Sequence, residues 1–111
     1  MKTHHVSAEA RAAVATRADR PATATIHDSA DARMVVFRLE PGQHVAPHTS
    51  VSSVVLVTIE GAGYVSGADG EVEVKAGDAV TYEPNELHGM RAGTERVVLL
   101  AIIAPRPGSR S

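Results

Sequence analysis

From Ala22 onward, the chain is a series of short runs rich in β-branched and aliphatic residues, separated by residues that favour turns. Such a series is typical of an all-β sandwich or barrel. The expected strands cover residues 22–28, 33–40, 43–48, 53–60, 62–66, 71–75, 79–83, 87–92 and 96–103. Asp69-Gly70 is a strong hairpin signal, and we also interpret Gly61-Ala62-Gly63 and Ala92-Gly93-Thr94 as turns between strands.

Residues 1–21 follow a different pattern. The stretch from Ser7 to Ala18 is rich in alanine with interspersed charges, which favours a short helix with Ser7 as its N-cap, and Pro21 ends the segment. The sequence therefore predicts a helical or irregular N-terminal arm at 1–21, a β-barrel at 22–105 and a flexible tail at 106–111.

Two of the expected strands, 54–59 and 97–103, are apolar at nearly every position. A strand with one face in water should instead alternate between apolar and polar residues. The outer face of these strands must therefore be covered, either by the N-terminal arm or by a second subunit. Of these two covers, we expect a homodimer.

The chain has 111 residues and a formal net charge of −2. A charge so near zero argues against binding nucleic acid through phosphates or a membrane through a basic patch. Cysteine is absent, which excludes disulfides, thiolate metal ligands and a cysteine nucleophile. No apolar stretch approaches the roughly 20 residues of a membrane span, and no signal-peptide pattern is present, so we expect a cytoplasmic protein.

Histidine is the most informative residue type in this composition. With no cysteine available, the histidines and carboxylates are the candidate metal ligands. The six histidines are His4, His5, His27, His44, His48 and His88.

Two segments resemble the motifs of the cupin superfamily. The first, 41–63, contains His48, and the second, 77–89, begins with Gly77-Asp78 and ends in His88-Gly89. His88 follows Gly77 by eleven residues, as in the second cupin motif. The resemblance extends over about residues 22–105 and is closest to small single-domain, type-2-like cupins. It implies a double-stranded β-helix, or jelly-roll, barrel.

The same resemblance implies an incomplete set of metal ligands. Cupins of this kind carry His-x-His and a Glu in the first motif and a His in the second. Here His48 and His88 are kept, whereas Ser50 occupies the second His position and Val54 the Glu position. The resemblance leaves open a divalent metal (Mn, Fe, Ni, Cu or Zn) held by His48 and His88, although an open site needs at least three protein ligands.

His44 is the remaining candidate for a third metal ligand. It has the same strand parity as His48, but four residues of strand separate the two by about 13 Å. Both rings would reach one ion only if Pro47 bent the strand sharply. We therefore expect His44 to be a polar residue near the mouth of the barrel.

Strand alternation defines a candidate ligand pocket inside the barrel mouth. By this rule, His48 lies on the face of Ala46 and Ser50. Alternation does not fix the direction of Tyr82 or Phe37: either ring could close the pocket or pack in the core, and for Phe37 we expect the core. No carboxylate is placed to orient a Ser50–His48 pair, so no catalytic residue can be assigned. The expected pocket residues are His48, Ser50, Thr58, Tyr82, His88 and Met90.

Three functions remain open at this point. The first is a cupin that binds a small organic molecule in the barrel, with or without a metal. The second is a metal-dependent enzyme of the dioxygenase or isomerase type, and the third is a structural dimer without catalysis. We expect neither nucleic acid nor a membrane as a partner.

Overall fold

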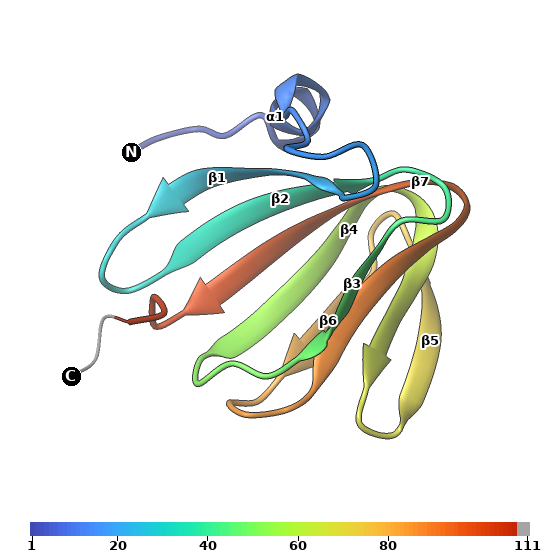
Figure 1. The fold of residues 1–111 in the computed structure, drawn as a ribbon. Helices are drawn as coiled ribbons and strands as arrows, with labels where there is room; N and C mark the ends of the chain where they lie inside the picture. The colour runs from blue at the N-terminus through green and yellow to red at the C-terminus, as the bar shows by residue number, and fades with distance from the viewer. Residues whose placement is uncertain (109–111) are drawn as a thin grey trace.

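The computed structural model describes residues 1–108, and within this range one short helix precedes seven strands (Figure 1). The helix is α1 (Val6–Ala12). The strands are β1 (Ala22–Asp28), β2 (Arg33–Leu39), β3 (His44–His48), β4 (Ser53–Gly67), β5 (Gly70–Lys75), β6 (Ala79–Tyr82) and β7 (His88–Ala104). The predicted all-β class is confirmed, and Asp69-Gly70 lies at the β4–β5 hairpin as expected.

Two long strands, β4 and β7, pass through both layers of the molecule (Figure 1). The first part of β4 pairs with β6 and its last part with β5. Likewise, β7 pairs first with β3 and then with β2. Because β4 and β7 also pair with each other, the described strands form one branched sheet folded over on itself.

The prediction of turns at Gly61-Ala62-Gly63 and Ala92-Gly93-Thr94 is wrong, because both segments lie inside continuous strands. In β4 the pairing register with β7 shifts between Thr58 and Glu60 and again between Gly61 and Gly63. Gly61 has φ +73°, and a Cβ there would collide with the Arg96 carbonyl oxygen. The glycines therefore form bulges that bend the strand from one layer to the other.

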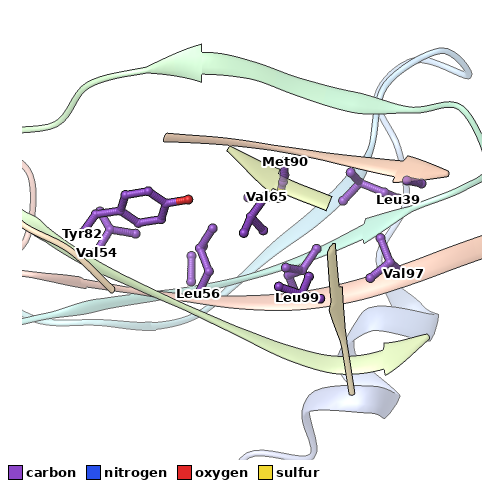
Figure 2. Close-up of a cluster of buried hydrophobic side chains, with 11 residues drawn as sticks. Leu39, Val54, Leu56, Val65, Tyr82, Met90, Val97 and Leu99 are labelled. Atoms are coloured by element: carbon purple, nitrogen blue, oxygen red, sulfur yellow. The ribbon is translucent and has the colours of Figure 1, made fainter. Parts of the chain in front are cut away.

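The core lies between the two layers (Figure 2). Val65 and Met90 from one layer face Leu56 and Leu99 from the other, and all four are at most 5% exposed. The cluster is almost wholly aliphatic, in keeping with a chain that has one Phe, two Tyr and no Trp. Tyr82, 6% exposed, is its one buried aromatic member among the described residues.

Helix α1 packs across the outside of β1 and β2 and is shorter than the sequence predicts (Figure 1). His5 rather than Ser7 is the N-cap, and Ala13 ends the helix in an extended conformation. The Arg38 guanidinium donates to the carbonyl oxygens of Ala10 and Ala13 at 2.5 and 3.0 Å, so it satisfies carbonyls that the helix leaves unpaired at its end. None of the described helices is long and apolar enough to cross a membrane.

Candidate functional site

A cavity of about 380 Å³ opens at one end of the folded sheet. Its walls are contributed by β2, β4 and β7, by the end of β3 and the loop between β3 and β4, and by the chain after β7. Most of the lining is apolar, and its polar groups are two imidazoles and two hydroxyls. The lining residues are Phe37, His48, Thr49, Ser50, Val51, Val54, Leu56, His88, Met90, Ala101, Ile103 and Pro107.

His48 and His88 form a cross-strand pair in one wall of this cavity. They lie directly opposite each other in the pairing of β3 with β7. Their ring centroids are 4.3 Å apart, with the ring planes inclined at 59°. His88 is only 5% exposed, whereas His48 lies at the exposed end of β3. The pair therefore has one buried member and one member at the cavity mouth.

A bulge in β3 brings His48 into this position. Val45 pairs with Met90, but His48, three residues further on, pairs with His88, which is only two residues from Met90. The extra residue reverses the alternation of the strand, so that Val45 and His48 both face inward. His44 pairs with Arg91, which points away from Met90 and His88, so His44 is exposed on the opposite face of the strand from His48. The expectation that these two histidines share a face is wrong, because it assumed a regular strand.

Both rings hold their Nδ1 atoms against backbone carbonyl oxygens. His48 Nδ1 lies 3.0 Å from the Ala46 oxygen, and His88 Nδ1 lies 3.1 Å from the Glu86 oxygen. A carbonyl oxygen can only accept, so each neutral ring is assigned its proton on Nδ1 and an unprotonated Nε2. Burial lowers the pKa of His88; the bond to Glu86 opposes this shift, and the neighbouring His48 adds to it.

Hydrogen bonds join the three segments that form the rim of the cavity. The Asn85 backbone N–H, in the turn before β7, donates to the Ser50 carbonyl oxygen at 2.7 Å. The hydroxyl of Ser52, a residue only 1% exposed, donates to the Pro105 carbonyl oxygen at 2.6 Å. Pro107 then lines the cavity. The chain after β7 is thus tied to the loop that carries Ser50.

The sequence places this chain end in a flexible tail at 106–111. In the structure, Arg106 forms an ion pair with Asp28 at 2.7 Å, and Pro107 contacts the site. Residues 109–111 of the expected tail lie outside the described residues. Pro107 therefore belongs to the cavity wall, and Arg106 is held against the end of β1.

The structure brings together four of the six residues expected in the pocket, namely His48, Ser50, His88 and Met90. The other two do not line the cavity. Thr58 is 2% exposed, and its backbone bonds to Gly77 and Asp78 in the turn before β6. Tyr82 donates its hydroxyl hydrogen to the Ser66 carbonyl oxygen at 2.8 Å, while its ring lies 5.2 Å from that of His88.

Several lining residues were not expected from the sequence. Ala101 and Ile103 follow Leu99 at intervals of two in β7, so strand alternation could have placed them on the inner face. Phe37, expected in the core, pairs with Leu99 and lines the cavity as well. No sequence signal identified Pro107, because its position depends on a contact made far along the chain.

The family model described as Cupin domain matches residues 35–103. The match includes His48, His88 and most of the strands that form the cavity. The chain therefore belongs to the cupin family, as the resemblance of its two motifs implied. No curated protein sequence matches the chain.

Solved structures with the same fold agree with this assignment. An RmlC-like cupin protein from Desulfovibrio desulfuricans is 27% identical with a TM-score of 0.79, over 95% of this chain and 97% of that one. A conserved protein with a double-stranded β-helix domain from Klebsiella pneumoniae is 24% identical with a TM-score of 0.78, over 87% of each chain. A predicted oxalate decarboxylase from Thermotoga maritima is 23% identical with a TM-score of 0.72, over 77% and 80%. The fold is thus a double-stranded β-helix.

The cavity contains all four positions at which the motif comparison expects metal ligands. His48 and His88 contribute imidazoles, but Ser50 contributes only a neutral hydroxyl and Val54 an aliphatic side chain. Among residues 1–108, no group of three or more His, Asp or Glu side chains is placed to hold an ion. A divalent ion at an open site needs three protein ligands, so the residues present do not fit a resident metal.

Proposed function

We propose that this cupin binds a small, mostly apolar organic molecule in the cavity beside His48 and His88, without a resident metal. The observation that carries the proposal is the cavity of about 380 Å³ with an apolar lining and one polar wall. This combination is typical of small-molecule sites. Since an apolar cavity of about 150 Å³ accommodates one benzene, the space fits a ligand of roughly ten to fifteen non-hydrogen atoms.

Binding is tested with 1-ethyl-4-fluorobenzene, an uncharged probe of suitable shape that cannot donate a hydrogen bond. We expect a saturable change in the amide NMR spectrum, confined to residues that line the cavity. The Ala101→Leu variant, which fills part of the space, should weaken binding, while Val55→Leu outside the cavity should not. The absence of saturation, or shifts located elsewhere, would contradict the proposal.

The metal-dependent alternative predicts a different result. If His48 and His88 hold an ion completed by water or substrate, protein purified without an affinity tag should contain a near-stoichiometric transition metal. That metal should be lost in His48→Ala. We expect well under one metal per chain, and a stoichiometric signal with that dependence on His48 would favour the enzyme.

We propose further that two copies of the chain associate through the outer face of β2, β7 and β4. Helix α1 covers Val36 and Val98 on this face, whereas Val55, Val57 and Ile102 stay partly exposed. Light scattering should give twice the 11.6 kDa of one chain. Val57→Glu should give a monomer, whereas a Thr25→Glu control on β1 should not. A dimer whose cavity binds no probe would favour the purely structural role.

A further inference from the structure

The cavity lining offers no formal charge to a ligand. None of the described residues that line it is Asp, Glu, Lys or Arg. A carboxylate or phosphate placed there would lose hydration without gaining an ion pair, and an ammonium group would meet the same difficulty. The lining therefore favours an uncharged ligand.

The two imidazoles in the wall offer acceptors. Their Nδ1 atoms are engaged by the carbonyl oxygens of Ala46 and Glu86, which leaves Nε2 as the available ring nitrogen. Within the described part of the chain, neither Nε2 has a hydrogen-bond partner. In this tautomer Nε2 carries a lone pair and no proton, so it accepts but does not donate.

Ser50, on the same cavity lining, can donate a hydrogen bond to a ligand. Its Oγ accepts the Ser52 backbone N–H at 3.1 Å, which leaves its own hydroxyl hydrogen free to donate. A ligand hydroxyl can donate to an imidazole and accept from a serine at the same time. An ether, a ketone or a carboxylate can do only the second, and would leave the imidazole lone pairs unpaired.

We infer that the ligands of this cavity are uncharged, largely apolar molecules carrying a hydroxyl group, which donates its hydrogen to the Nε2 lone pair of the His48–His88 pair. The inference rests on the proposed function, since it specifies the chemistry of a ligand in the same cavity. It assigns the two histidines as specificity-determining acceptors.

Three probes of similar shape separate this inference from the proposed function. At pH 8, NMR titrations compare 4-ethylphenol, 1-ethyl-4-fluorobenzene and 4-ethylbenzoate. We expect the phenol to bind roughly three- to tenfold more tightly than the fluoro analogue, the range of one net hydrogen bond, and the benzoate to bind most weakly. Equal binding of phenol and fluoro analogue, or tightest binding of the benzoate, overturns the inference while cavity binding stands. If none of the three binds, the proposed function fails as well.

Histidine variants and ring spectra test the role of the imidazoles. Because His48 is exposed, His48→Phe should fold, and we expect it to reduce the phenol advantage, as should His88→Phe if that variant folds. Retention of the full advantage in His48→Phe, and in His88→Phe where it can be measured, contradicts the inference. Without ligand, two-bond ¹H–¹⁵N spectra of the wild-type rings should show the Nδ1–H tautomer for both histidines, and an Nε2–H tautomer for both would overturn it.

Discussion

Pro47 packs directly against the bare Cα of Gly89: a Cβ at residue 89 would lie 3.1 Å from the Pro47 nitrogen and 2.9 Å from the Ser66 hydroxyl oxygen. Pro47 belongs to the bulge that turns His48 inward, and Gly89 follows His88 in β7. The histidine pair therefore depends on a backbone contact that only glycine allows without a shift.

Replacing this glycine should disturb the pair. We expect Gly89→Ala to lower the free energy of unfolding by about 1–3 kcal/mol, because the added methyl group overpacks against backbone. It should also shift the ring resonances of His48. Gly67→Ala is the control, since its Cβ would come closest to the Asp69 carboxylate, the end of a side chain, at 3.3 Å. Unchanged His48 resonances in Gly89→Ala would refute the dependence.

The bend of β4 at Gly61 leads to a second prediction. Gly61→Ala should destabilise the fold by more than Gly42→Ala, by at least about 2 kcal/mol. Both glycines have positive φ, of 73° and 82°, but only a Cβ at residue 61 meets another backbone atom, the Arg96 carbonyl oxygen. Both variants place a Cβ at positive φ, and only Gly61→Ala adds the clash. The difference between their free energies of unfolding, measured by urea denaturation, therefore reports the clash alone. Equal losses would show that the strand can relax.

The hydroxyl of Ser52 should hold the chain end that lines the cavity. Ser52→Ala removes the bond to the Pro105 carbonyl oxygen, so we expect a loss of about 1–2 kcal/mol and faster amide exchange after β7. Ser53→Ala is a matched control, because within the described residues the Ser53 side chain makes no hydrogen bond. A similar effect of both substitutions would mean that the bond to Pro105 is not the cause.

Arg38 should determine whether helix α1 stays docked. Arg38→Met keeps most of the aliphatic stem but removes the donors to the Ala10 and Ala13 carbonyl oxygens. We expect a loss of about 2 kcal/mol and increased amide exchange in α1. Arg17→Met removes only a contact with Asp19, at the surface, and should change little. If the amide protons of α1 exchange no faster in Arg38→Met than in the wild type, Arg38 does not hold the helix in place.

Glu40 should contribute to the acid sensitivity of the protein. Hydrogen bonds from Arg96 and Arg38 lower the pKa of Glu40 below its usual 4.5, although partial burial opposes them. The unfolded state therefore binds a proton at Glu40 more readily than the folded state does. The stability that ionised Glu40 contributes to the folded state is thus present above pH 4.5 and is lost as the pH falls through the folded pKa. The stability difference between wild type and Glu40→Gln should shrink from pH 6 to pH 3. A constant difference would exclude this linkage.

The strands and the family follow from local properties of the sequence. Five of the seven strands lie within a residue or two of the expected runs, because alternation and turn residues act over a few positions. The two motifs likewise identified His48 and His88, since a motif is a matter of residue type and spacing.

Tertiary structure decided where those residues meet and what else surrounds them. Gly61 lies at a bend inside β4 rather than in a turn, because β4 stays paired with β7 on both sides of it. The opposing strand comes so close at Gly61 that a side chain would not fit. His44 and His48 lie on opposite faces because one bulge adds a residue, and alternation cannot detect an added residue. Pro107 lines the cavity in a segment that is held by the bond from Ser52 to Pro105 and by the ion pair of Arg106 with Asp28. The sequence alone determined the strands, the family and the two histidines; register and long-range contacts, which depend on the whole fold, determined the site.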